Sequence, residues 1–200
     1  MSAILVFIAL VCGHLASEVK SELVKNRTVF IGRLNFRGDL EMSNGKDRFF
    51  KARNLPTGDV DVIQKWVLQD ESDYSPRVIG SMKEDRQKVR KEFHAYPFPY
   101  VYTTFDGQRH SRMHRENGEY VIVYLNHETP YSNATIGKSD FFGDWTFSHD
   151  GKTIVSFSRK WLSTLNKYAI TMEPGHDIKD NFATFVMFFV LQHGNVTKWE

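Results

Sequence analysis

The chain has 200 residues, which is enough for one domain with a substantial core. Its hydrophobic share of 41% and charged share of 25% exclude an intrinsically disordered protein. A formal net charge of only +2 excludes a whole-molecule field that would draw the chain onto nucleic acid or a membrane.

An unbroken apolar run, Ala3 to Val11, lies at the start of the chain. It is shorter than the about 20 apolar residues of a membrane span, and small residues follow it, as in a secretory signal peptide. We therefore expect residues 1–17 to be a cleaved signal peptide and residues 18–200 to form a single exported domain. A buried N-terminal strand is the alternative, although core strands rarely lie at a chain end. The candidate cleavage points follow Gly13, Ala16 and Ser17.

The only cysteine, Cys12, lies inside this leader. The exported domain then has no disulfide and depends on burial for its stability. Three Asn-x-Ser/Thr sequons predict surface glycans on an exported chain, and chance occurrence is the alternative. Their acceptors are Asn26, Asn133 and Asn195. Asn133 is the strongest candidate, because the residues before it have the composition of an exposed turn.

Strand signals dominate the rest of the chain. It contains 16 phenylalanines, and aromatic and β-branched residues favour strands. Alternating or apolar runs predict strands at 27–36, 48–52, 60–69, 78–83, 99–105, 109–115, 119–125, 145–148, 153–159 and 167–172. The turns Asn44-Gly45, Asp106-Gly107, Asn117-Gly118 and Asp150-Gly151 are predicted to be type I′ hairpins. This spacing is typical of an antiparallel sandwich or barrel.

Two segments between these runs have open alternatives. Asp85–Phe93 is strongly charged and fits either a helical turn or a long strand. Tyr96–Tyr100 is rich in aromatic residues and prolines, and it fits either a recognition loop or the entry to a packed strand.

The segment Phe182–Leu191 is apolar on every side, so we expect burial on all its faces. It is too short for a transmembrane helix. Periodicity does not separate a buried helix from a buried strand here, and its phenylalanine and β-branched content favours a strand. Asp180 and Asn181 before it and Gly194 after it are candidate helix caps, which favour a helix.

The order of elements in the last third resembles the LURP-one-related family, which groups with tubby C-terminal domains and phospholipid scramblases. The resemblance lies in Gly143–Phe147, Asp150–Trp161, Lys167–Ile170, Pro174–Asp177 and the apolar run that follows. It covers residues 140–195 clearly and residues 30–135 only in the rhythm of hairpins. The resemblance implies a mainly β fold, a closed antiparallel barrel of about twelve strands around a central apolar C-terminal helix.

The resemblance implies much about fold and little about function. Tubby domains bind phosphoinositides through basic residues on the barrel surface, but those positions do not map onto this chain. Scramblases carry calcium-site and palmitoylation features that this sequence lacks. The exported domain is also cysteine-free, so it has no palmitoylation site.

Two pairs of residues could suggest metal or catalytic chemistry. His110 and His114 have the spacing of helical metal ligands, but on a strand they would share one face about 13 Å apart. We therefore expect a basic, solvent-facing strand and no metal there. His176-Asp177 suggests acid–base work, yet an Asp bonded to its own backbone in a turn is the simpler interpretation. No nucleophile elbow and no phosphate-binding glycine loop occur, so we expect no enzyme activity and no cofactor.

Basic residues gather in two stretches that we expect to form a cationic patch. Such a patch suits an anionic lipid headgroup or a sulfated glycan, and a solvated charged face is the alternative. Its members are Lys83, Arg86, Lys88, Arg90, Lys91, Arg109 and Arg112. The sequence thus predicts a secreted, non-enzymatic module that binds a partner or an anionic ligand through its surface. The alternatives are a scramblase-like lipid-handling protein and a hydrolase with an unrecognised site.

Overall fold

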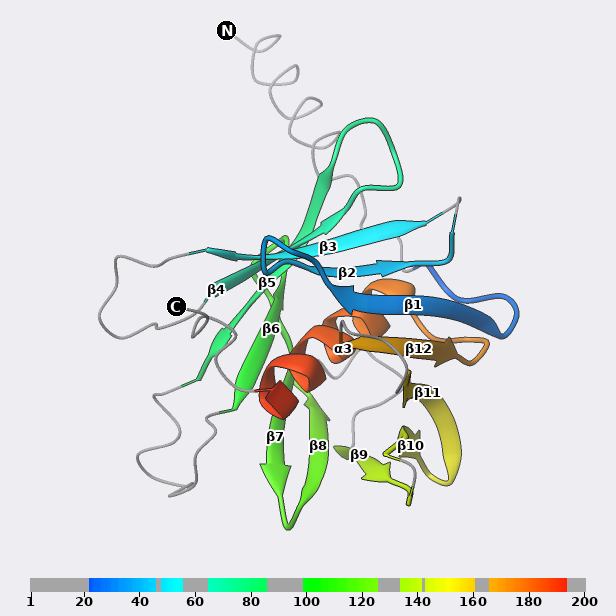
Figure 1. Ribbon diagram of the computed structural model, residues 1–200. Coiled ribbons are helices and arrows are strands. Elements are labelled where there is room, and N and C mark those ends of the chain that lie inside the picture. The colour runs from blue at the N-terminus through cyan, green and yellow to red at the C-terminus, as the bar shows by residue number, and fades with distance from the viewer. Residues whose placement is uncertain are drawn as a thin grey trace, which may run out of the picture.

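Twelve antiparallel strands close into a ring around one helix (Figure 1). The computed structural model describes residues 22–45, 48–55, 65–85, 99–125, 134–141, 143–160 and 166–193. Around the ring the strand order is β1-β12-β11-β10-β9-β8-β7-β6-β5-β4-β3-β2, so each strand pairs with its sequence neighbours and β1 closes against β12. The predicted fold, a closed antiparallel barrel with an apolar C-terminal helix, is confirmed.

Every strand is short, and most alternate buried with exposed side chains, as in a sheet with one face inside. In β12, for example, Tyr168, Ile170 and Met172 are buried while the residues between them are partly exposed. The strands are β1 (Thr28–Leu34), β2 (Leu40–Ser43), β3 (Phe49–Leu55), β4 (Lys65–Asp70), β5 (Arg77–Glu84), β6 (Tyr100–Thr104), β7 (Arg109–Glu116), β8 (Glu119–Tyr124), β9 (Ala134–Ser139), β10 (Trp145–His149), β11 (Lys152–Arg159) and β12 (Lys167–Met172).

Two of these strands lie outside the runs predicted from the sequence. β2 has four residues, too few for an alternation to stand out. β9 turns only Thr135 and Gly137 inward, so it lacks an apolar pattern. Both strands form because their neighbours in the ring supply hydrogen bonds on either side.

The type I′ prediction is right for two turns and wrong for two. Asn117 and Asp150 have φ of 50°, and each is followed by a glycine that also has positive φ, as this turn requires. At Asp106-Gly107 and Asn44-Gly45 only the glycine has positive φ. The reason is loop length, because Thr104 N–H bonds to the carbonyl of Gln108 and Asn44 N–H to that of Arg48, which closes five-residue loops.

The apolar C-terminal segment is a helix, α3 (Ile178–His193), and not a strand. The residues from Asn181 to Leu191 are all buried, so no face of this stretch meets solvent. Figure 1 shows α3 in orange and red in the middle of the ring of strands. A closed ring offers no sheet edge to an added strand, whereas a helix satisfies its own backbone hydrogen bonds in the interior.

Asp177 is the N-cap of α3, so the predicted caps Asp180 and Asn181 are wrong. Its Oδ1 accepts hydrogen bonds from the backbone N–H groups of Lys179 (2.8 Å) and Asp180 (3.3 Å). Its Oδ2 accepts the N–H of Glu22 at 2.7 Å, which ties the start of the described chain to the helix. The expectation that Asp177 bonds backbone groups near itself is confirmed, and the third predicted cap, Gly194, lies outside the described residues.

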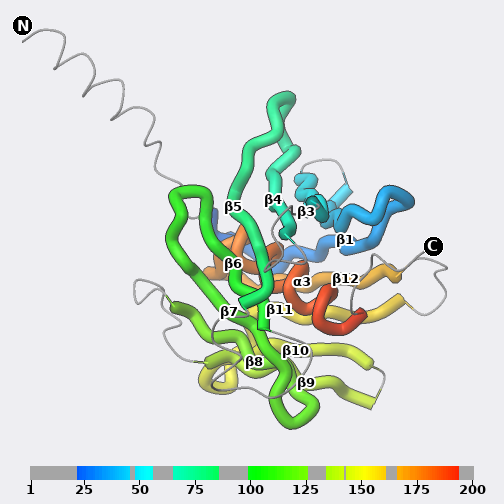
Figure 2. Tube along the Cα trace, turned by 90° about the vertical axis from the view of Figure 1, so that its left-hand side faces the viewer, coloured from blue at the N-terminus to red at the C-terminus, as the bar shows by residue number. Residues whose placement is uncertain are grey.

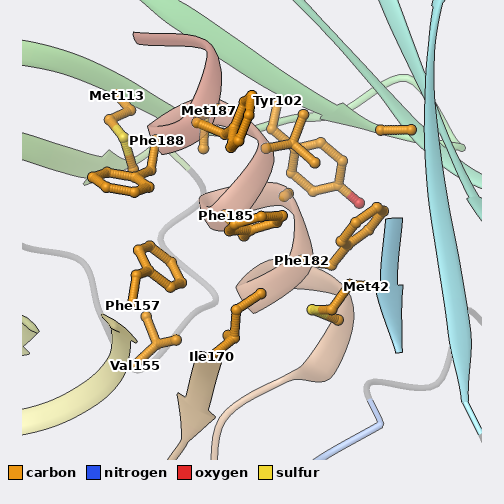
Figure 3. Close-up of a cluster of buried hydrophobic side chains, with 14 of the residues drawn as sticks. Met42, Tyr102, Met113, Val155, Phe157, Ile170, Phe182, Phe185, Met187 and Phe188 are labelled. Atoms are coloured by element: carbon orange, nitrogen blue, oxygen red, sulfur yellow. The ribbon is translucent and has the colours of Figure 1, made fainter. Parts of the chain in front are cut away.

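The core is aromatic and contacts the helix from several walls. Phe182 packs on Phe50 of β3 with ring centroids 5.4 Å apart, and Phe188 packs on Phe157 of β11 at 4.9 Å. Figure 3 shows Phe182 and Phe188 on the helix among side chains of the surrounding strands. Since strands from different parts of the ring pack on one helix, barrel and helix form one hydrophobic core.

Several predictions fall on residues outside this description. They are the signal peptide 1–17, the acceptors Asn133 and Asn195, and most of Asp85–Phe93 and Tyr96–Tyr100. Asn26 is described and is exposed just before β1. Within the described ranges, the search for a helix with the length and apolar character of a membrane span finds none.

Candidate anion-binding site

The strand register brings three basic side chains into one row on the outer wall. Lys65 of β4 pairs with Lys83 of β5, Lys83 with Val101 of β6, and Val101 with Arg112 of β7. Cross-strand partners point to the same face of a sheet. Each cation is next in sequence to a core residue (Trp66, Met82 or Met113), so the row faces outward. We call Lys65, Lys83 and Arg112 the cationic row.

Spacing and exposure suit this row to an anionic group. Lys65 and Lys83 are on adjacent strands, about 5 Å apart at the backbone, and Lys83 and Arg112 are two strands apart, about 10 Å. Both lysines are exposed, whereas Arg112 is only partly exposed and Val101, between Lys83 and Arg112 on the same face, is buried. Figure 2 shows the consecutive strands β5, β6 and β7 running side by side on the face toward the viewer.

The guanidinium of Arg112 is partly desolvated. Its Nε and Nη1 atoms are buried, and in the described part of the chain they have no hydrogen-bond partner. Its neighbour His114 is also buried. Burial first, and the charge of Arg112 second, lower the pKa of the His114 imidazole. A cation that has lost water on one side gains most from an anion on its remaining open side.

Three of the described carboxylates near the row have partners of their own. Asp85 forms an ion pair with Arg109 at 2.5 Å, and Glu84 accepts a hydrogen bond from Tyr100 OH at 3.3 Å. Glu116 contacts Nε2 of His114 at 3.5 Å. None of these three described carboxylates forms an ion pair with a cation of the row.

The structure rearranges the predicted cationic patch. It brings Lys83 and Arg112 together, but it places Arg109 in a different row, opposite Thr103. Lys65 was missed, since its position depends on the pairing of β4 with β5, which no local pattern indicates. The other predicted members, Arg86, Lys88, Arg90 and Lys91, lie outside the described residues.

The prediction of a solvent-facing β7 is wrong for both histidines, which are buried. A β-bulge opposite Tyr102 and Thr103 adds one residue to β7 at His110 and reverses the alternation there. His110 thus turns inward, with Nε2 at 3.3 Å from Asp180 Oδ2 of α3, while His114 stays on the outer face. Among the described residues, the search for clusters that suit a metal ion finds none.

Two side chains at the C-terminal end of α3 make polar contacts with strands of the barrel. Tyr168 OH lies 2.9 Å from Nε2 of His193, and Tyr120 OH donates to Oε1 of Gln192 at 2.5 Å. Burial, and then the nearby charge of Arg159, lower the pKa of His193 to about 4. Burial raises the pKa of Tyr120 to about 12, so both tyrosines stay protonated donors at neutral pH.

This contact predicts a loss of stability in acid. The folded pKa of His193 lies below its ordinary value of 6.5, so the unfolded chain binds the proton more tightly. The stabilisation is complete above pH 6.5 and is lost as the pH falls toward about 4. We expect His193→Phe to lose less unfolding free energy than the unmodified chain over this window in urea titrations. An unchanged slope against pH would contradict this prediction.

Comparison with known proteins found no matching family model, no matching curated protein and no matching solved structure.

Proposed function

We propose that this chain is a non-enzymatic binding module that holds an anionic ligand on its cationic row. The ligand class is a sulfate or phosphate group, carried by a sulfated glycan or by a lipid headgroup. We further propose that the domain is exported after removal of residues 1–17 and belongs with the LURP-one-related and tubby-like barrels. The closed barrel around an apolar helix is the architecture that this resemblance implies, and it supports the family proposal.

One observation carries the ligand proposal. Arg112 has two guanidinium nitrogens that are buried without a hydrogen-bond partner in the described part of the chain, beside two exposed lysines in register. Arg112 keeps its positive charge although it is partly buried, and the two lysines add mobile point charges around it. The row combines both on a rigid sheet, so the cations are positioned before a ligand arrives.

The exposed lysines allow a test that leaves the fold intact. We expect Lys65→Glu combined with Lys83→Glu to weaken binding of a heparin-derived oligosaccharide by more than about tenfold, since two attractive charges become repulsive. Isothermal titration calorimetry measures this affinity, and added salt lowers it in the unmodified chain. A parallel titration with a soluble short-chain phosphatidylserine distinguishes a glycan from a lipid headgroup.

The matched control is Lys25→Glu combined with Lys152→Glu. Both lysines are exposed and lie outside the row, so the net charge changes equally. We expect this control to bind like the unmodified chain. Equal losses in the two double variants would reduce the effect to net charge and remove the proposed site, and so would the absence of binding to both probes.

Export and glycosylation stand as further parts of the proposal. Asn26 is exposed ahead of β1, which supports a glycan at that sequon. Its sequon partner Thr28 turns its hydroxyl to the carbonyl of Asn26 at 2.8 Å. Expression in a secreting eukaryotic cell, followed by mass spectrometry of the released protein, tests the cleavage and the glycan together.

A further inference from the structure

Two loops of the same construction lie at one end of the barrel. Asn35–Asp39 joins β1 to β2, and Asp140–Asp144 joins β9 to β10, with the shared sequence Asx-Phe-x-Gly-Asp. Both follow strands that run toward the end where His193 of α3 meets Tyr168. We call this end the exit end. In Figure 2 both connections lie on the right-hand side of the molecule.

The same hydrogen bonds close both loops. In each, the N–H of the first residue bonds to the carbonyl of the fifth, and the glycine N–H bonds back to the carbonyl of the first, at 2.9 and 3.1 Å in both cases. The side chain of the first residue, Asn35 or Asp140, also accepts the N–H of the fifth. These loops are therefore pre-formed, and they hold their second residue at the tip.

That second residue is a phenylalanine in almost complete contact with solvent. Phe36 is 94% exposed and Phe141 is 97% exposed. Single exposed apolar residues are ordinary on protein surfaces. Here, however, two closed loops of matching design present the largest common apolar side chain outward at the same end. Such rings suit the interfacial zone of a lipid bilayer, where aromatic side chains are favoured.

Three cationic residues lie at the exit end of the barrel between the two loop tips. The barrel order from β1 to β10 passes through β12 and β11, whose exit ends carry Lys167 and Lys160. Arg33 of β1 pairs with Lys167, and the N–H of Lys160 bonds to the carbonyl of Lys167, so the three are neighbours in one row. Arg37 follows Phe36 directly and is exposed. Anionic headgroups attract lysines and arginines near a membrane surface by about 1 kcal/mol each.

Three acidic residues near this rim have partners within the protein, whereas Asp140, which precedes Phe141, is exposed. Glu41 pairs with Arg33 at 3.0 Å, and Asp39 pairs with Lys51 at 3.3 Å. Asp144 accepts a hydrogen bond from the Ser158 hydroxyl at 2.7 Å. Lys160 and Arg37 thus add positive charge without a compensating carboxylate in the ion pairs of the described residues.

The opposite end of the barrel also has exposed rings. Its exposed rings are Phe105, on a third five-residue loop, and Tyr74. Asp106 follows Phe105 and Asp73 precedes Tyr74, just as Asp140 precedes Phe141 at the exit end, and Asp73 pairs with Arg77 at 3.2 Å. Among the described residues, the exit end differs in the row of Arg33, Lys167 and Lys160 that lies between its two rings.

We propose that the exit end is a membrane-docking surface that places Phe36 and Phe141 in the interfacial zone of a bilayer with anionic headgroups. Lys160, Lys167 and Arg37 contact the headgroups between and beside the two rings. The cationic row lies on other strands, β4 to β7, although Lys65 begins β4 at this same end of the barrel. The exposed rings are not part of the row, so variants of the rings and variants of the lysines test the two proposals separately.

Vesicle binding of the full chain tests the docking surface. The probes are vesicles of phosphatidylcholine and vesicles of phosphatidylcholine with phosphatidylserine, measured by flotation. We expect binding to the anionic vesicles only. Phe36→Ser and Phe141→Ser should each weaken it about tenfold, and the double variant by about the product of the two, because the loops act independently. Both side chains are exposed, so the variants keep the fold.

Phe105→Ser is the matched control, since Phe105 is 66% exposed on a loop of the same hydrogen-bond pattern at the other end. We expect it to bind like the unmodified chain. Phe36→Trp and Phe141→Trp should show quenching by brominated lipid above the background of the four native tryptophans, and Phe105→Trp should not.

Three results would overturn the docking surface: equal losses for Phe36→Ser and Phe105→Ser, no loss for the exit-end variants, or no vesicle binding by the unmodified chain. A chain that keeps vesicle binding but loses the heparin-derived oligosaccharide with Lys65→Glu and Lys83→Glu supports both surfaces. If the exit-end variants bind vesicles like the unmodified chain while oligosaccharide binding is intact, only the docking surface is ruled out.

Discussion

Replacing Phe188 by alanine should lower the free energy of unfolding by about 3–5 kcal/mol. Phe188 is fully buried in the middle of α3. Its ring lies between 4.9 and 6.1 Å, centroid to centroid, from rings on several strands. These partners are Tyr120, Trp145, Phe147, Phe157 and Tyr168. Because they belong to β8, β10, β11 and β12, the cavity would have walls that pair with one another and resist collapse.

Urea unfolding followed by far-ultraviolet circular dichroism measures this loss. Phe141→Ala is the control, since it removes the same atoms from a ring that is exposed, and we expect a change within about 0.5 kcal/mol. A similar cost for both substitutions would show that α3 does not depend on the barrel wall for its packing.

Gly80→Ala should lower the free energy of unfolding by about 3 kcal/mol. A methyl group at this position of β5 would lie 2.5 Å from the carbonyl oxygen of Thr103 and 2.6 Å from the ring of Tyr102. The carbonyl belongs to the backbone of β6, which pairs with β5, so relief requires the two strands to separate. The ring is also held, since Tyr102 OH donates to the carbonyl of Ile79.

Ser81→Ala is the matched control for this prediction. Ser81 is the next residue of β5, it is partly exposed, and it faces the other side of the sheet. We expect the midpoint of thermal unfolding to fall strongly for Gly80→Ala and little for Ser81→Ala. Equal midpoints would mean that β5 and β6 separate at little cost at this point of the ring.

Sequence patterns alone predict some residues of the two proposed surfaces and not others. Lys83 and Arg112 were predicted as parts of a cationic patch because basic residues cluster near them in the chain. Lys65 and the separation of Arg109 from the row depend on strand register, a contact between residues far apart in sequence. The matching loops around Phe36 and Phe141 are readable as a repeated Asx-Phe-x-Gly-Asp motif, but their common end of the barrel is not.

His110 shows why a local pattern failed within a correctly predicted strand. Alternation places residues four apart on one face, and this holds only while the ladder is regular. The bulge opposite Tyr102 and Thr103 shifts the register by one residue, and His110 turns in toward Asp180 of α3. Bulges arise from the fit of neighbouring strands, so the sequence of β7 carries no sign of this one.

The amino-acid sequence determined the strand-rich character, the two I′ turns, and the burial of the C-terminal apolar segment, because these follow from backbone preferences and hydrophobicity of nearby residues. Tertiary structure decided that this segment is a helix, that Asp177 caps it, and which cations share a face. The physical reason is range: burial of an apolar segment favours no particular secondary structure, and a closed ring of strands leaves the helix as the form that satisfies its own hydrogen bonds.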